Sequence, residues 1–205
     1  MTKAARRIKL CIVQAAFYGL FACAALSVQA QEQVPVFAVS RQESAVKFFV
    51  KASIELRGTF DKWDATLTFA SRDVTTGVLR VTVQAASVDA GSSIKNNRLK
   101  SADFFDVQEN PLITFVSKTI TQTGPDSFEV PGNFTIRGVK RPEMLTLKVS
   151  GRGTGSGVIS GTMAFDRKNY GMNSGIPFVT IANHVEVTVL LRANRIAGPP
   201  LVFKQ

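Results

Sequence analysis

The sequence predicts an all-β fold, because apolar and polar residues alternate with a period of two along several short segments. In the first of them, Val46, Phe48 and Val50 share one face. The alternation recurs at 65–69, 79–85, 145–149 and 185–191, and turn-forming residues occur at 57–58, 76–77, 124–125, 137–138 and 151–157. Short strands with one apolar face form a sandwich or a closed barrel, and the alternation alone does not choose between them.

Residues 1–30 have the pattern of a secretory signal peptide. A basic start precedes an apolar run over 10–26, and small residues follow at Val28 and Ala30. The basic residues are Lys3, Arg6, Arg7 and Lys9. We therefore expect cleavage after Ala30, a flexible leader over 31–35 and a periplasmic protein.

Two other interpretations of this segment are open. A membrane anchor needs about 20 apolar residues, so the run over 10–26 is barely long enough. A lipoprotein acylated on Cys23 is the second alternative, and it is disfavoured by the bulky Phe21 before that cysteine.

Removal of residues 1–30 changes the bulk properties. That segment holds four of the 25 basic residues and none of the 15 acidic ones, so the remaining 175 residues carry a net charge of +6. A chain of this length can bury one core. Cys11 and Cys23 both lie in the predicted signal, so the exported chain has no disulfide, thiol nucleophile or cysteine metal site.

Four short motifs occur in order along the chain. They are L-K-S-A-D-F-F-D at 99–106, P-L-I-T-F-V-S at 111–117, V-P-G-N-F-T-I-R-G-V-K-R-P at 130–142 and F-D-R-K-N-Y-G-M at 165–172. Together they resemble the YceI-like family of polyisoprenoid-binding periplasmic proteins. The resemblance covers residues 36–193 and leaves 194–205 as a C-terminal tail.

The resemblance implies an extended, lipocalin-like antiparallel barrel of eight strands, and it thereby favours a barrel over a sandwich. One stretch interrupts the alternation. Residues 92–108 place Ile94, Leu99, Phe104 and Phe105 among polar side chains, and we expect a short helical insertion there.

The resemblance further implies that the barrel sequesters or carries a long-chain isoprenoid lipid, either a quinone or a polyprenyl phosphate. The chain holds 15 Phe against two Tyr and one Trp, so the inward faces are rich in phenylalanine. These rings either fill a solid core or line an apolar tunnel. The predicted lumen residues are Phe48, Phe60, Leu67, Phe69, Phe104, Phe115, Phe134, Ile136, Met163, Phe165 and Tyr170.

Arg167 is the most informative polar residue. It lies two residues after Phe165 and four after Met163, and residues at this spacing on a strand point to the same face. Arg167 therefore faces the lumen if Met163 and Phe165 do. A guanidinium there can bind a phosphate or a quinone carbonyl of the ligand head. Alternatively, it ties the chain beside Gly171 to neighbouring carbonyl groups, and the sequence does not decide between these roles.

The surroundings of this arginine depart from the family pattern. The acid that the family often carries two residues later is Asn169 here. The Asp and His that the family often has near the L-x-S segment are Asn96 and Arg98. The region is therefore biased towards positive charge, which makes Arg98 and Lys95 further head-group candidates.

The sequence offers few parts for catalysis. His184 is the single histidine, and its parity places it on the outer face beside Glu186. With no thiol in the exported chain, we expect no enzyme, no metal site and no cofactor other than the bound lipid. The alternative function is a stress-related or surface-interaction barrel whose core is filled by its own phenylalanines.

The expected partner is a long-chain isoprenoid lipid. Transient contact with a membrane surface and a homodimer are further options. Nucleic acid is not an expected partner, because the chain is exported and its basic residues are not interleaved with exposed stacking aromatics.

Overall fold

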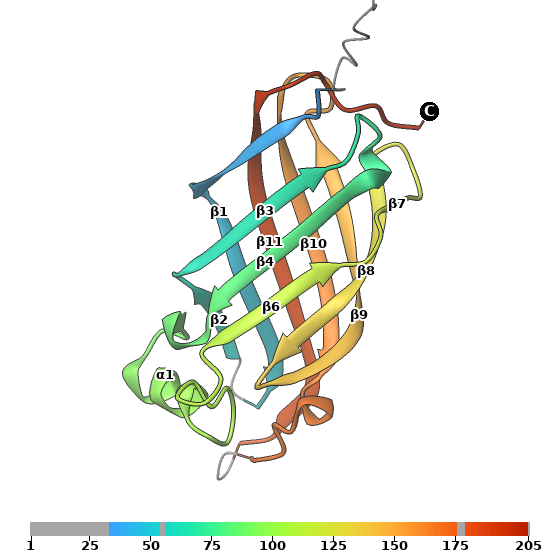
Figure 1. The fold of residues 1–205 in the computed structure, drawn as a ribbon. Coiled ribbons are helices and arrows are strands. Elements are labelled where there is room, and N and C mark those ends of the chain that lie inside the picture. Colours follow the sequence, from blue (N-terminus) through green and yellow to red (C-terminus); the bar gives the residue numbers. More distant parts are fainter. Residues whose placement is uncertain (1–32, 54–55, 176–178, 205) are drawn as a thin grey trace, which may run out of the picture. The chain divides into compact units, whose positions relative to one another are not determined.

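The computed structural model describes residues 33–53, 56–175 and 179–204, and it confirms the all-β prediction with one α-helix added (Figure 1). All described residues belong to one compact unit. The predicted signal peptide lies outside the described residues. The strands are β1 Val36–Ala52, β2 Leu56–Phe60, β3 Trp63–Phe69, β4 Gly77–Gln84, β5 Val88–Asp89, β6 Leu112–Ser117, β7 Thr121–Gln122, β8 Ser127–Ile136, β9 Val139–Ser150, β10 Ser156–Asp166 and β11 Ile181–Ala197. The helices are α1 Ser93–Lys100 and the 3₁₀ turns Val74–Thr76, Ala85–Ser87 and Arg167–Tyr170.

The strands form one antiparallel sheet. They pair in the order β3-β4-β6-β8-β9-β10-β11-β1-β2-β5, and β7 pairs with β8 beside this path. The sheet therefore has eleven strands in the described chain, and the prediction of eight is wrong. Eight strands have six or more residues, whereas β2, β5 and β7 have two to five. Two-residue strands are too short to show a period of two, so the sequence does not reveal them.

The sheet curls until β1 and β3 come together (Figure 1). No backbone ladder joins these two strands in the described part of the chain. Side chains connect them instead: the rings of Phe37 and Phe69 lie 5.8 Å apart, and Arg41 Nη2 lies 3.4 Å from Asp64 Oδ1. The result is a strongly curled half-barrel that encloses an apolar core.

Alternating residues of the strands point into this core, as the sequence pattern predicts for 46–51. Two glycines let core side chains approach the backbone closely. A Cβ at Gly132 would lie 2.4 Å from Phe115 Cζ, and a Cβ at Gly161 would lie 2.8 Å from Leu147 Cδ2. Any larger residue at either glycine would therefore displace a core side chain.

The predicted insertion is confirmed as α1, which lies at one end of the curled sheet (Figure 1). Ser92 is its N-cap, and the Ser92 Oγ accepts a hydrogen bond from Lys95 N at 3.3 Å. Leu99, Phe104 and Phe105 are buried, so the helix and the turns after it cover this end of the core. Among the described residues, no helix is both long and apolar enough to span a membrane.

Candidate functional site

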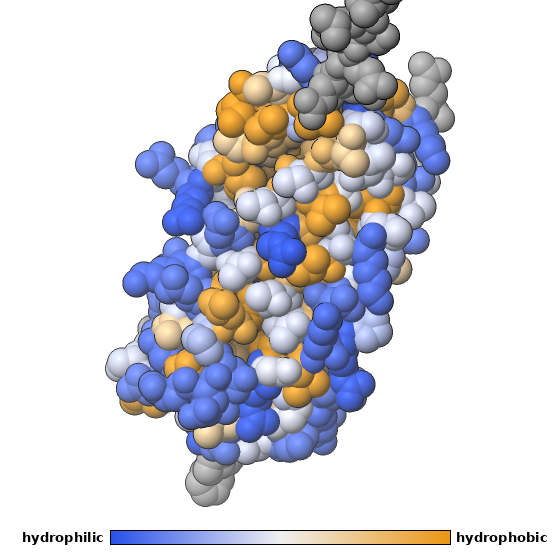
Figure 2. Space-filling view, in the orientation of Figure 1, coloured by the Kyte–Doolittle hydropathy of each residue, from blue (hydrophilic) through white to orange (hydrophobic). Residues whose placement is uncertain are grey.

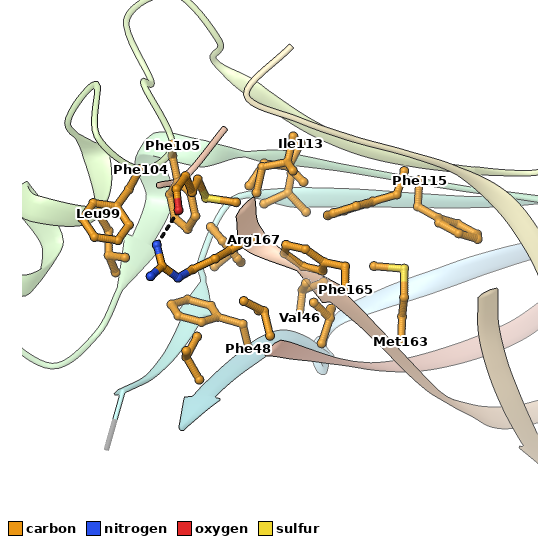
Figure 3. A pocket seen from close by; sticks show the side chains of 18 of the residues that line it. Val46, Phe48, Leu99, Phe104, Phe105, Ile113, Phe115, Met163, Phe165 and Arg167 are labelled. Atoms are coloured by element: carbon orange, nitrogen blue, oxygen red, sulfur yellow. Dashed lines mark hydrogen bonds between the residues drawn. The ribbon is translucent and has the colours of Figure 1, made fainter. Parts of the chain in front are cut away.

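The interior holds a cavity of about 90 Å³ at the end that carries α1 (Figure 3). Inward side chains of β1, β2, β4, β6 and β8–β11 line it, together with Leu99, Phe104 and Phe105 from the helical insertion. Apart from Thr114 and Arg167, every lining residue is apolar. The cavity can therefore take an apolar group, and its wall includes one buried arginine.

Eight of the eleven predicted lumen residues line this cavity: Phe48, Phe60, Phe104, Phe115, Phe134, Ile136, Met163 and Phe165. Leu67 and Phe69 instead line a second cavity of about 100 Å³ farther along the sheet. Parity shows which face of a strand a residue occupies, but not its height along the interior. Contact of these residues with a lipid stays a prediction.

Tyr170, the last of the predicted lumen residues, lies outside the lining of both cavities, and its contact with a lipid stays a prediction. Its ring is fully buried, with its centroid 5.5 Å from that of Phe134 and 5.2 Å from that of Phe165. Its hydroxyl donates to Glu143 Oε1 at 2.6 Å. The residue belongs to the 3₁₀ turn Arg167–Tyr170, where the alternation of a strand no longer applies.

The pKa of Tyr170 is raised, first by burial and then by its hydrogen bond to Glu143. Tyr170 is the only tyrosine after residue 30, so the tyrosinate absorbance of a chain spanning 31–205 reports it alone. We expect its titration midpoint to lie above the ordinary value of about 10. The folded protein holds this proton more tightly than the unfolded chain. Its free energy of unfolding therefore falls as the pH rises above about 10.

Tyr170→Phe separates the hydrogen bond from the ionisation. At neutral pH the variant loses the bond to Glu143, and we expect it to be about 1.5–3 kcal/mol less stable. The difference from the wild type should narrow above a pH of about 10, because the variant has no phenol to ionise. Urea unfolding at a series of pH values measures both effects. A titration midpoint at the ordinary tyrosine value would contradict the buried hydrogen bond.

Arg167 is buried, with 6 % of its surface exposed, and it follows β10 directly. Its Nε donates to Ala182 O at 3.2 Å. Its Nη1 donates to Ser174 O at 3.0 Å and also to Met172 O. The guanidinium therefore ties the loop after Gly171 to the start of β11, which is one of the two roles that the sequence leaves open.

Arg167 is also the one charged residue among the described residues that line the cavity. No carboxylate of the described chain forms an ion pair with Arg167. Buried charges in proteins are usually paired, so carbonyl dipoles alone are an unusual environment for a buried cation. An anionic group in the cavity would complete this environment.

The other two head-group candidates lie on α1. Arg98 Nη1 lies 2.6 Å from Asp103 Oδ2, and Arg98 Nη2 donates to Gly175 O at 3.0 Å. Asp103 Oδ1 accepts a hydrogen bond from Ser174 Oγ at 2.9 Å. This bond, followed by the charge of Arg98, lowers the pKa of Asp103. Arg98 thus joins the insertion to the loop 173–175, while Lys95 is half-buried in the first turn of the helix.

His184 faces outward, as its parity predicts. Its Nε2 lies 3.8 Å from Glu186 Oε1, and the two side chains are 65 % and 61 % exposed. Across 33–53, 56–175 and 179–204, no three His, Cys, Asp or Glu side chains are grouped closely enough to hold a metal ion. The histidine is therefore a surface residue outside the cavity lining.

Two curated relatives resemble part of this chain. Protein YceI of Salmonella arizonae is 35 % identical over 98 residues, and a UPF0312 protein of Azotobacter vinelandii is 32 % identical over 98 residues. Each match covers 48 % of this chain and 51 % of the relative. The chain thus spans about half the length of the curated relatives it matches.

Solved structures share the fold. The crystal structure of BcnA from Burkholderia cenocepacia gives a TM-score of 0.69 at 24 % identity, covering 76 % of this chain and 99 % of BcnA. A polyisoprenoid binding domain from Saccharophagus degradans, implicated in plant cell wall breakdown, gives 0.65 at 15 % identity, covering 78 % and 99 %. At these identities the likeness shows the fold alone. The sequence pattern of the YceI-like domain, however, matches residues 37–193, and the chain therefore belongs to the YceI-like family.

Proposed function

We propose that this protein binds a long-chain isoprenoid lipid, a quinone or a polyprenyl phosphate, and that it sequesters or carries the lipid inside its curled sheet. The observation that carries the proposal is the apolar cavity with its one buried cation. A polyisoprenoid has the matching chemistry, because its apolar chain ends in a polar head. The likeness to the polyisoprenoid binding domain of Saccharophagus degradans supports the same class of ligand.

Burial of the isoprenoid chain supplies the driving force in this proposal. Each Å² of apolar surface removed from water contributes about 25 cal/mol, so several isoprene units bind without specific polar contacts. The cavity of about 90 Å³ is smaller than the roughly 150 Å³ cavity that holds one benzene. Loading therefore requires the interior to widen, and the unbranched side chains of Met163 and Met172 can move most readily.

The polar head in this proposal lies beside Arg167. A phosphate there would be an anionic partner for the guanidinium, which pairs with no carboxylate of the described chain. Charge-assisted hydrogen bonds are also stronger than neutral ones. Arg98 and Lys95 are secondary candidates, because Arg98 already pairs with Asp103.

The small size of the cavity also favours a second candidate function, a stress-related or surface-interaction protein with a filled core. The rings of Phe48, Phe60 and Phe105 pack at centroid distances of 5.6 to 6.3 Å, as in a solid core. Such a protein would need no lipid, and its interior would stay closed.

Native mass spectrometry of a chain spanning 31–205, followed by lipid extraction, tests the proposal. Protein mixed with a polyprenyl phosphate or with a polyprenyl quinone should gain the mass of one lipid and melt at a higher temperature. Folded protein that takes up neither lipid would support the filled core instead. The same spectra show whether the chain forms the expected homodimer.

We also propose that the protein is periplasmic and takes up lipid during transient contact with a membrane surface. The intact mass of protein made in a bacterial host should then correspond to a chain that begins at Gln31. As a control, Ala30→Trp should block cleavage at this site, because the peptidase needs a small residue. A diacylglycerol mass on Cys23 would indicate a lipoprotein, and retention of 10–26 in membranes would indicate an anchor.

A further inference from the structure

The second cavity, of about 100 Å³, lies at the end of the sheet opposite α1 (Figure 1). Side chains of β1, β3, β4 and β8–β11 line it, together with the glycine-rich hairpin 151–157 and the C-terminal tail. In Figure 2, apolar side chains gather at this end of the molecule, whereas polar ones dominate the end with α1. The exposed apolar residues here include Val36, Ile196 and Val202.

The two cavities follow each other along one interior. On β4, Val81 lines the first cavity and Leu79 the second, and Leu145 and Leu147 divide in the same way on β9. Inward neighbours on a strand are about 7 Å apart, so roughly one layer of side chains separates the cavities. An apolar chain that enters the first cavity and pushes this layer of side chains aside would reach the second cavity.

The tail closes the second cavity with alternate side chains. Leu201 and Phe203 are half-buried and line the cavity, whereas Val202 between them is 52 % exposed. The ring of Phe203 lies 6.2 Å from the ring of Phe128, and the guanidinium of Arg152 lies 5.2 Å from the centroid of Phe203. Phe203 is therefore clamped between an aromatic ring of the core and a cation of the hairpin.

Hydrogen bonds fix the tail to two neighbouring segments. Val202 N donates to Arg72 O at 2.8 Å, and Val202 O accepts from Val74 N at 3.1 Å. The side chain of Gln122 both accepts from Lys204 N at 2.8 Å and donates to Lys204 O at 2.9 Å. The tail thus forms one isolated parallel β-bridge, between Val202 and Asp73.

We infer that the tail segment 199–204 is the stop that sets the length of the apolar chain the protein accepts. The inference rests on the proposed function, because it assigns the far end of the lipid to the second cavity. A chain end that arrives there meets Leu201 and Phe203 as part of the wall. The tail lies beyond the segment 37–193 that matches the family.

The size of the expected effect follows from the ring of Phe203. Six carbon atoms leave the wall in Phe203→Ala, and an isoprene unit has five. A cavity of roughly 150 Å³ holds one benzene, so the existing cavity plus the space of the ring gives room for about one further isoprene unit.

The test exposes a chain spanning 31–205 to a ladder of uncharged polyprenols and identifies the retained lengths by extraction and mass spectrometry. Phe203→Ala should shift the longest retained polyprenol upward by about one isoprene unit. Leu201→Trp fills the same cavity and should shift it downward. Val202→Ala is the matched control, because this side chain points outward and its backbone hydrogen bonds remain. Melting temperatures establish that each variant is folded.

Folded Phe203→Ala and Leu201→Trp that retain the same lengths as the wild type would overturn the stop alone. If Phe203→Ala does not fold, Leu201→Trp decides by the presence or absence of the downward shift. Wild-type protein that retains no polyprenol and also takes up neither a polyprenyl phosphate nor a polyprenyl quinone would overturn the proposed function and this inference with it.

Discussion

Replacing Leu191 with aspartate is expected to lower the free energy of unfolding by about 5 kcal/mol, which is comparable to the whole stability of many domains. Leu191 lies on β11 and is 1 % exposed. The change leaves a void where the leucine was and places a carboxylate among apolar neighbours, where a charge without a partner is costly. Urea unfolding followed by the fluorescence of Trp63 measures the loss.

The chain offers a matched control one residue away. Leu190 is the same residue type on the same strand, but it points outward and is 40 % exposed. Leu190→Asp introduces the same charge into water, so we expect its stability to stay within about 1 kcal/mol of the wild type. Equal losses from the two variants would mean that Leu191 also reaches solvent, which contradicts the enclosed interior.

The alternation of the sequence predicted the inner and outer faces of the sheet well. It placed Phe48 and Phe165 inside and His184 outside, because a side chain in a strand has only two faces to choose from. It could not separate the two cavities, since residues on one face share a parity along the whole strand. Leu67 and Phe69 are examples: both were expected in the interior, and both line the second cavity rather than the first.

Other features depend on contacts between distant segments. Asp103 meets Arg98 nearby in sequence but also Ser174, which lies 71 residues away. The tail is similar: Phe203 packs on Phe128, and nothing within the tail itself indicates that partner. The resemblance supplied the fold and the ligand class that we propose, but it stops before the tail. Such pairings are visible only once the sheet is assembled.

The two roles of Arg167 illustrate the same limit. Parity brought its side chain into the interior, yet parity says nothing of what a side chain binds there. Its three partners are backbone carbonyls, which any residue type carries, so no sequence pattern marks them. The structure adds the tie to the loop, and binding of a ligand head by Arg167 remains a proposal.

Replacing Arg167 with methionine is expected to lower the free energy of unfolding by about 3–5 kcal/mol. Methionine keeps an apolar stem of similar reach but donates no hydrogen bond. The carbonyl groups of Met172, Ser174 and Ala182 then lose a partner in a buried place. Each such group costs about 1–3 kcal/mol, and relaxation of the loop keeps the total below their sum.

Arg141→Met is the matched control for stability. Arg141 also donates its Nε to a backbone carbonyl, that of Asn169 at 2.8 Å, but the side chain is exposed. Water replaces that bond when the arginine is removed, so the loss should stay within about 1 kcal/mol. Similar losses from both variants would show that burial of Arg167 adds nothing to its bonds.

The ligand then separates the structural role of Arg167 from a head-group role. Arg167→Met is compared with the wild type, at a temperature where both are folded, for binding of a polyprenyl phosphate and of an uncharged polyprenol of the same length. A charge-assisted bond is about twice as strong as a neutral one, so the phosphate should lose about tenfold more affinity than the alcohol. Equal losses for both lipids, together with the lower stability, would leave the guanidinium only its tie to the loop. Unchanged stability and unchanged affinities would show that Arg167 neither stabilises the loop nor binds the head group. The head group would then be expected to bind near Lys95 and Arg98. We expect the larger loss of affinity for the polyprenyl phosphate, because the buried Arg167 has no carboxylate partner and a phosphate would supply the missing negative charge.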